Sequence, residues 1–216
     1  MKRKIMIVDD HSIVLHGLAL LINSEPDFEV TLQAGSTEAA LEILKTSATP
    51  DLVITDISLP GLSGVELLKE LSTRFPKLPT LVMSMHDEML HGERAFKAGA
   101  RGYLMKQEAT DKVIFAIRRI LDGETYLSDR MQSQLLKKMR DGGSSGSSIL
   151  SNLSDREYEV FRLIGMGNGS SDIAAKLQRS VKTVEAHRAN LKQKLGLKNA
   201  SELNRFAATW ADRERV

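Results

Sequence analysis

The sequence predicts an α/β domain with a doubly wound parallel sheet, followed by a small all-α domain. In the first 122 residues, short apolar, β-branched runs alternate five times with longer stretches of helical period. This alternation is typical of parallel strands whose crossover helices cover both faces of the sheet. After residue 150 only the helical period recurs. With 216 residues, the chain is long enough for two ordinary domains.

The elements of the first domain follow from local patterns. Strands are expected at residues 4–9, 28–33, 51–56, 80–84 and 102–105, and helices near 12–24, 36–47, 64–74, 87–98 and 110–122. A further amphipathic helix is expected at 128–140, with Met131, Leu135, Leu136 and Met139 on one side. Residues 141–148 are rich in Gly and Ser, the composition of a flexible coil. We therefore predict domains at 1–122 and 151–216, joined by a linker at 123–150.

The second domain is expected to contain helices near 154–166, 170–177, 181–195 and 201–211. Ser154 and Glu157 have the spacing of a capping box at the start of the first helix. Gly167 and Gly169 end that helix and open the turn to the second. The helical period places on the core side Ile173, Ala174 and Leu177 of the second helix and Val181, Val184, Leu191 and Leu195 of the third.

Composition and charge limit the classes of function. The chain has no cysteine, which excludes disulfides and thiolate metal sites and favours a cytoplasmic location. No apolar run approaches the ~18 residues of a membrane span, so we expect no membrane partner. Residues 1–122 hold 14 Lys and Arg against 17 Asp and Glu, whereas residues 123–216 hold 16 against 11. The basic second half makes nucleic acid a candidate partner.

Polar side chains stand where four of the five predicted strands end. Asp9 and Asp10 end the first strand, Asp56 the third and Ser84 the fourth, and Lys106 follows the fifth. In a parallel sheet these ends meet at one edge, where ligands bind. Acidic residues at single strand ends are often solvated turn residues, but the combination indicates a site.

The chemistry of this set suits phosphoryl transfer. Three carboxylates brought together repel one another unless a cation lies among them, and hard oxygen ligands suit Mg²⁺. An aspartate can accept a phosphoryl group covalently. A lysine and a small hydroxyl can then bind the oxygens of that group.

Three segments resemble the receiver domain of bacterial response regulators: residues 7–11 (IVDDH), 51–61 (DLVITDISLPG) and 99–106 (GARGYLMK). The resemblance covers about 120 residues and implies a flavodoxin-like (βα)5 fold. It implies that Asp56 is the phosphoacceptor and that Mg²⁺ is held by Asp9, Asp10, Asp56 and the backbone carbonyl of Ser58. It further implies that Ser84 and Lys106 contact the phosphoryl group and that the rotamer of Tyr103 follows activation. Two positions depart from the usual pattern: Leu59 replaces Met, and Ser84 stands where Thr is as common.

The third helix of the second domain is basic. Between residues 179 and 198 the chain holds six cations and one acid, Glu185. A helix that presents small and long polar side chains among cations suits a major groove, although a solvated basic helix has the same composition.

The second domain also resembles a known family, the LuxR-type helix-turn-helix of NarL/FixJ response regulators. The resemblance rests on residues 153–160 (LSDREYEV), 171–177 (SDIAAKL), 180–188 (SVKTVEAHR) and 194–197 (KLGL). It implies that the helix at 181–195 enters the major groove with Glu185, Ala186 and Ala189 toward the bases, while phosphates are contacted by Lys182, Thr183, His187, Arg188 and Lys192. It implies that the last helix mediates dimerisation on DNA, for which we expect contacts from Ser201, Leu203, Phe206 and Trp210.

These observations predict a transcription regulator, not an enzyme. We expect a sensor histidine kinase to phosphorylate Asp56, and we expect the homodimer that follows to bind promoter DNA in a sequence-specific manner and to act on RNA polymerase. A phosphatase of the haloacid dehalogenase type is the enzymatic alternative, but Ser58 stands where such enzymes carry a second aspartate. A regulator controlled by partner binding without phosphorylation is a third possibility.

Overall fold

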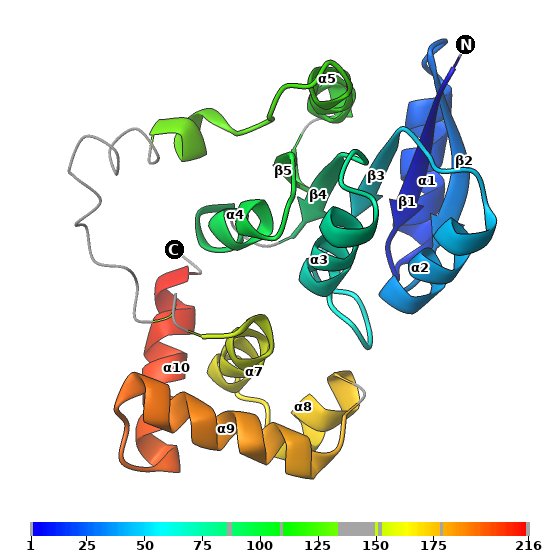
Figure 1. The fold of residues 1–216 in the computed structure, drawn as a ribbon. Helices are drawn as coiled ribbons and strands as arrows, with labels where there is room; N and C mark the ends of the chain where they lie inside the picture. Colours follow the sequence, from blue (N-terminus) through cyan, green and yellow to red (C-terminus); the bar gives the residue numbers. More distant parts are fainter. Residues whose placement is uncertain are drawn as a thin grey trace. The chain divides into compact units, whose positions relative to one another are not determined.

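The computed structural model describes residues 2–85, 88–108, 110–133, 150, 153–177 and 179–214 (Figure 1). The chain divides into two compact units, residues 1–137 and 138–216. The first unit contains β1 (Arg3–Val8), α1 (Ser12–Asn23), β2 (Phe28–Ala34), α2 (Thr37–Thr46), β3 (Leu52–Thr55), α3 (Gly64–Arg74), β4 (Thr80–Ser84), α4 (Glu88–Lys97), β5 (Gly102–Met105) and α5 (Thr110–Leu121). The second contains α7 (Asp155–Gly165), α8 (Ser170–Lys176), α9 (Val181–Leu195) and α10 (Ala200–Glu214).

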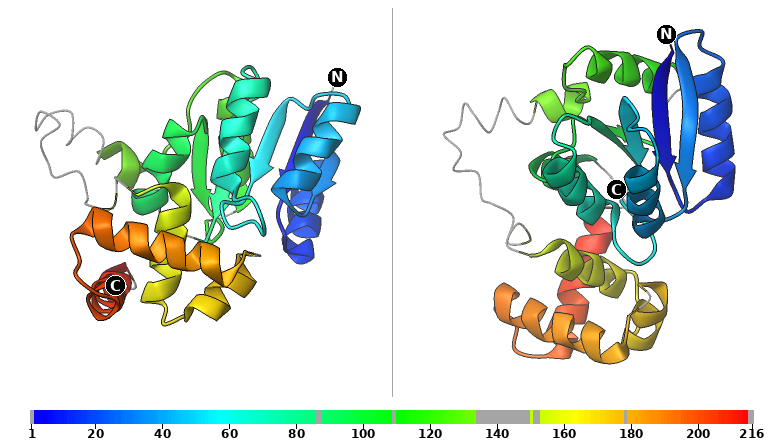
Figure 2. Two further views of the ribbon diagram at one scale, coloured as in Figure 1. Left: turned by 60° about the horizontal axis from the view of Figure 1, so that its bottom comes forward. Right: turned by 45° about the vertical axis from the view of Figure 1, so that its right-hand side comes forward.

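The first unit is built on one five-stranded sheet with the strand order β2-β1-β3-β4-β5. Every neighbouring pair of strands is parallel (Figure 2). This is the flavodoxin-like order, so the predicted fold class is confirmed. The predictions for β1 and β3 end one residue too late. These strands end at Val8 and Thr55, and Asp9 and Asp56 follow directly.

Helices cover both faces of the sheet because strand residues alternate in direction. Ile5 and Ile7 of β1 belong to one apolar cluster with residues of α1 and α5. Met6 and Val8, the alternating residues, belong to another with residues of α2 and α3. A third cluster joins α3 and α4 over Val82 of β4. Because helices pack on both faces, the sheet and the ends of its strands are held in place, and the candidate site lies at these ends.

The chain after α5 packs on the first unit instead of leaving it at residue 122. The amide of Tyr126 donates to the carbonyl of Arg101 (2.9 Å), and the carbonyl of Tyr126 accepts from the amide of Tyr103 (3.3 Å). Met131 is 4% exposed. The predicted linker at 123–150 therefore begins within the first unit. The later part of the predicted helix at 128–140 and the Gly- and Ser-rich stretch at 141–148 lie outside the described residues.

The four helices of the second unit share one apolar core, in which Phe161, Ile173, Leu191, Leu203 and Ala207 are fully buried. The prediction for Val181 is wrong, since this residue is 46% exposed. Helical side chains lean toward the helix N-terminus, so at the first position of α9 its side chain points past the end of the helix and away from the core.

A buried carboxylate joins α7 to α9. Glu157 Oε2 accepts from the amide of Ser154 (2.8 Å), and the Ser154 hydroxyl accepts from the amide of Glu157 (3.3 Å), so the predicted capping box is confirmed. The same Oε2 accepts from Nζ of Lys194 on α9 (2.6 Å). Burial on its own raises the pKa of Glu157, but the hydrogen bonds from Lys194 and Ser154 outweigh it and lower that pKa. In the described part of the chain, no helix is long and apolar enough to cross a membrane.

Candidate functional site

Two aspartates stand directly beyond the carboxyl ends of neighbouring strands, and the sheet fixes their backbones. The amide of Asp9 donates to the carbonyl of Ala34 on β2, and the amide of Asp56 donates to the carbonyl of Val8 on β1, both at 3.0 Å. Asp9 is 2% exposed and Asp56 is 5% exposed. Two buried carboxylates on adjacent strands repel each other, so their ionised forms require a cation.

Lys106, just beyond β5, is such a cation. Its Nζ contacts Oδ2 of Asp9 at 2.6 Å and Oδ2 of Asp56 at 2.8 Å, and its side chain is 9% exposed. Burial on its own disfavours the ammonium, but the two carboxylates outweigh it and hold the pKa of Lys106 above its ordinary value of 10.5. Lys106 is therefore a fixed positive charge held between two predicted site residues.

The outer part of the pocket is acidic. His11 Nδ1 lies 2.9 Å from Oδ1 of Asp10 and 3.2 Å from Oδ1 of Asp9, and the His11 amide donates to the same oxygen of Asp9 (2.9 Å). One ligand atom from each of these three residues lies within 4.8 Å of the others, an arrangement that could hold a metal ion. The two carboxylates fit Mg²⁺, which prefers oxygen ligands. The only sign of these His11 contacts in the sequence is that His11 directly follows Asp10.

The remaining predicted receiver residues lie around this centre. The amide of Ser58 donates to Oδ1 of Asp56 at 3.3 Å. Ser84, the last residue of β4, is fully buried, and its carbonyl accepts from the amide of Lys106 at 2.8 Å. Tyr103 of β5 is also fully buried and lies in the apolar cluster of α3 and α4. The ring of Tyr103 is therefore turned inward in this structure.

The loop between Asp56 and α3 is packed too tightly for a side chain at its end. A Cβ on Gly64 would lie 1.9 Å from the carbonyl oxygen of Asp56. The amide of Gly64 donates to the carbonyl of Ile57 (2.9 Å), and Ser63 with Glu66 forms a capping box at the start of α3. Sequence reasoning missed Gly64, although the spacing of Ser63 and Glu66 marks the helix start.

A second contact that sequence reasoning missed joins the segment after α5 to α4. The hydroxyl of Ser128 donates to Oε1 of Glu88, which is 5% exposed. A Cβ on Gly92 would lie 2.5 Å from the terminal methyl of Met131. Both contacts are long-range in sequence, so no local pattern predicts them.

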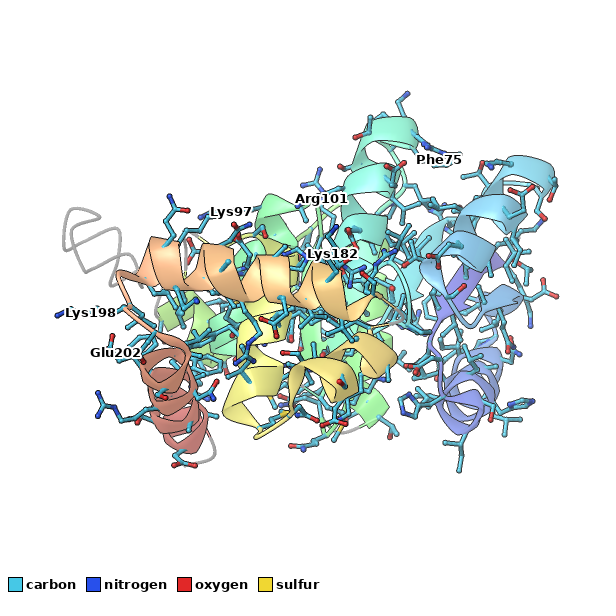
Figure 3. The ribbon with its side chains drawn as sticks, turned by 90° about the horizontal axis from the view of Figure 1, so that it is seen from below. Phe75, Lys97, Arg101, Lys182, Lys198 and Glu202 are labelled. Atoms are coloured by element: carbon cyan, nitrogen blue, oxygen red, sulfur yellow. The ribbon has the colours of Figure 1, made fainter. Side chains whose placement is uncertain are left out.

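In the second unit, α8 and α9 form the predicted helix-turn-helix. The hydroxyl of Ser180 accepts from the amide of Thr183 (3.1 Å) and caps α9. The side chains expected at a DNA surface are mostly accessible: Lys182, Thr183, Glu185, Ala186 and Ala189 are exposed, and His187 and Lys192 are half-buried. Figure 3 labels Lys182 near the start of α9 and Lys198 beyond its end.

Arg188 departs from its predicted role as a phosphate contact. Its side chain is only 12% exposed, and its Nη2 donates to Oδ1 of Asn204 on α10 (2.9 Å). Its Nε lies 3.9 Å from Oε1 of Glu185. An arginine with this burial and this partner stabilises the packing of α9 on α10, which argues against the predicted phosphate contact.

The last helix presents a mixed surface. Ser201 and Phe206 are exposed and Trp210 is half-buried, and the two aromatic residues line a shallow hollow with Leu197. The prediction for Leu203 is wrong, since this residue is fully buried in the core of its own unit. The helical period identifies an apolar residue but does not tell whether the core or a second copy covers it.

Family models match both units. Residues 5–118 match the response regulator receiver domain, and residues 151–207 match the bacterial regulatory proteins of the luxR family. The chain is 37% identical over 211 residues to the oxygen regulatory protein NreC of Staphylococcus epidermidis, with 94% of this chain and 96% of that protein covered. The chain belongs to the NarL/FixJ-type response regulators. This is a family of transcription regulators and not of enzymes, so the phosphatase alternative is dropped.

Solved structures of response regulators are similar to this chain, two of them over both units. RcsB of Salmonella typhimurium superposes with a TM-score of 0.69 at 26% identity, covering 96% of this chain and 98% of that one. RcsB of Salmonella enterica serovar Typhimurium, bound to the promoter rprA in the presence of the phosphomimetic BeF3-, gives 0.65 at 27% identity, covering 96% and 99%. A LuxR-family two-component response regulator from Aurantimonas sp. gives 0.60 at 30% identity, covering 65% and 99%.

Proposed function

We propose that this response regulator is phosphorylated on Asp56 by a sensor histidine kinase, then dimerises and binds promoter DNA in a sequence-specific manner. The observation that carries the proposal is the shared contact of Lys106 with Asp9 and Asp56 at one rim of the sheet. This contact brings a nucleophile, a second carboxylate and a fixed cation together. A phosphoryl group on Asp56 would enter a site that already holds its counter-charge.

In the proposed reaction, a carboxylate oxygen of Asp56 attacks the phosphorus of a phosphohistidine on the kinase. The P–N bond breaks, the P–O bond of an acyl phosphate forms, and the imidazole leaves and takes up a proton. Mg²⁺, held by Asp9, Asp10, Asp56 and the carbonyl of Ser58, would supply positive charge to the phosphoryl oxygens when bound. Lys106 stays protonated because its pKa is raised, so it neither gives nor takes a proton.

The proposed switch starts from the new charge on Asp56. The phosphoryl oxygens attract Lys106 and accept a hydrogen bond from the Ser84 hydroxyl. Movement of Ser84 opens space behind it that the ring of Tyr103, fully buried in this structure, can fill. The surface of α4, β5 and α5 is then repacked, a two-state change caused by a local charge.

On DNA, α9 is proposed to enter the major groove with Glu185, Ala186 and Ala189 toward the bases. Lys182, Thr183, His187 and Lys192 contact phosphates, and such contacts position the protein without reading sequence. Ser201, Phe206 and Trp210 of α10 contact the second copy. The solved complexes of RcsB with DNA, including two RcsB dimers bound to two parallel DNAs, support DNA binding by a dimer. A regulator of this kind acts in the cytoplasm, where its DNA and RNA polymerase are.

Genomic footprinting with and without a small phosphodonor tests the proposal. We expect the phosphodonor to raise occupancy at a defined set of promoters for the wild type and not for Asp56→Ala. Asp51→Ala is the matched control, because Asp51 precedes β3 and pairs with Arg3 outside the pocket. Equal occupancy for the wild type with and without phosphodonor would favour a regulator controlled by partner binding alone.

A further inference from the structure

The carboxylate of Glu185 on α9 is held from outside its own helix. The hydroxyl of Ser170, the first residue of α8, donates to Oε1 of Glu185. The Glu185 side chain is 58% exposed, so it remains accessible on the surface that is proposed to face the bases. An exposed glutamate normally samples many rotamers, and a hydrogen bond from a neighbouring helix reduces that freedom.

The hydroxyl that holds Glu185 stands on a rigid support. Asn168, in the turn before α8, donates from its side-chain amide to the carbonyl of Leu163 (2.9 Å) and accepts from Nζ of Lys176 (2.7 Å). Ile173, one turn after Ser170, is fully buried in the core. The position of Ser170 is therefore set by the packing of the unit and not by the local loop alone.

Among the described residues, Ser170 and Arg188 both contact the same oxygen of the Glu185 carboxylate. Arg188 Nε lies 3.9 Å from Oε1, and Arg188 is itself held by Asn204. Ser170 and Arg188 thus fix the orientation of the carboxylate through Oε1, and Oε2 can accept a hydrogen bond from an external donor. The amino group of cytosine is such a donor in the major groove.

We propose that Ser170 is a positioning residue for base recognition: its hydroxyl orients Glu185 so that the carboxylate accepts a hydrogen bond from a cytosine amino group. The inference rests on the proposed base-facing role of Glu185. Pre-organisation of this kind improves discrimination, because less rotamer freedom is lost when the correct base is bound.

The test uses the full chain treated with phosphodonor. Binding-site selection with the wild type yields a preferred sequence, and affinities are then measured for it and for variants with each base pair changed. Glu185→Ala should reduce discrimination at one base pair by about tenfold or more, the range of a good base contact. Ser170→Ala should reduce discrimination at that same pair by about threefold to tenfold, as expected for one hydrogen bond.

Three further variants separate positioning from other roles. Ser170→Thr, which keeps the hydroxyl, should restore discrimination. The double variant Ser170→Ala/Glu185→Ala should discriminate no worse than Glu185→Ala, because the hydroxyl acts through the carboxylate. Ser171→Ala removes an exposed hydroxyl from the same helix and should leave the base profile unchanged. Thermal unfolding of each variant verifies that the fold is retained.

Several results would overturn the inference. If Ser170→Ala lowers affinity equally for all sequences, Ser170 contacts a phosphate; if its effect adds to that of Glu185→Ala, it acts independently. Unchanged discrimination in Ser170→Ala alone rejects the positioning role and leaves the base contact of Glu185 intact. Unchanged base preference in Glu185→Ala rejects both, whereas phosphodonor-dependent binding to the selected sequence would still support the proposed function.

Discussion

The Lys106→Met variant tests whether one ammonium balances two buried carboxylates. Met preserves most of the length and the apolar stem of Lys but has no charge. Asp9 and Asp56, 2% and 5% exposed, would then face each other without the shared cation. We expect the first unit to lose stability in buffer without divalent ions, and Mg²⁺ to restore much of it.

The magnitude follows from the burial of the three groups. Removing one partner of a buried ion pair costs about 3–5 kcal/mol, and the neighbouring Asp10 is exposed to solvent, so we take about 3 kcal/mol. With a urea m-value of about 2 kcal/mol/M, the unfolding midpoint should fall by about 1.5 M. Mg²⁺ at a hundred times its dissociation constant would return about 2.7 kcal/mol by binding the native state.

Urea unfolding followed by far-UV circular dichroism measures this loss. The fluorescence of Trp210, the single tryptophan, reports on the second unit and should not change. Lys112→Met is the matched control, because Lys112 pairs with Glu108 at an exposed site and its loss should leave the midpoint unchanged. If Lys106→Met unfolds at the wild-type midpoint, or gains no more from Mg²⁺ than the wild type does, the account of the pocket charges is wrong.

Three further predictions concern packing, pH and DNA affinity. Gly64→Ala should destabilise the first unit by about 3 kcal/mol, because its Cβ would overlap the carbonyl oxygen of Asp56. Gly17 lies on α1 with open space around it, so Gly17→Ala should stabilise the unit by up to about 1 kcal/mol. Urea unfolding of both variants measures the two effects. The lowered pKa of Glu157 means that its ionised form stabilises the second unit above the ordinary pKa of 4.5 and that this contribution disappears as the pH falls through the lower native pKa. Glu157→Gln keeps the cap but loses the charge paired with Lys194, so it should cost about 1 kcal/mol near pH 7 by Trp210 fluorescence, and this cost should shrink as the pH falls below 4.5; a constant difference across pH would contradict this. Lys192→Ala should weaken DNA binding uniformly across sequences and reduce the salt slope by about one, and a change in base preference would argue against a phosphate contact.

Much of the fold was predictable because it depends on local periods. Five apolar runs gave the five strands, and the residues at their ends, Asp9, Asp56 and Lys106, meet as the parallel topology requires. The capping box of Ser154 and Glu157 was also predictable, since both partners lie within one helical turn.

The errors arise where a property depends on neighbouring elements. The helical period made Val181 a core residue and Leu203 a surface contact, but the ends and neighbours of the helices decide both. Arg188 has the charge of a phosphate contact, yet Asn204, 16 residues away in sequence, holds it. The packing of Met131 against Gly92 of α4 also has no local signal.

The most direct measurement is the mass of the intact chain after treatment with a small phosphodonor and Mg²⁺, for the wild type beside Asp56→Asn. The wild type should gain one phosphoryl group that hydroxylamine removes, as expected of an acyl phosphate, and Asp56→Asn should gain none. Equal incorporation in the two proteins would contradict the central claim that the carboxylate bound to Lys106 is the site of phosphorylation.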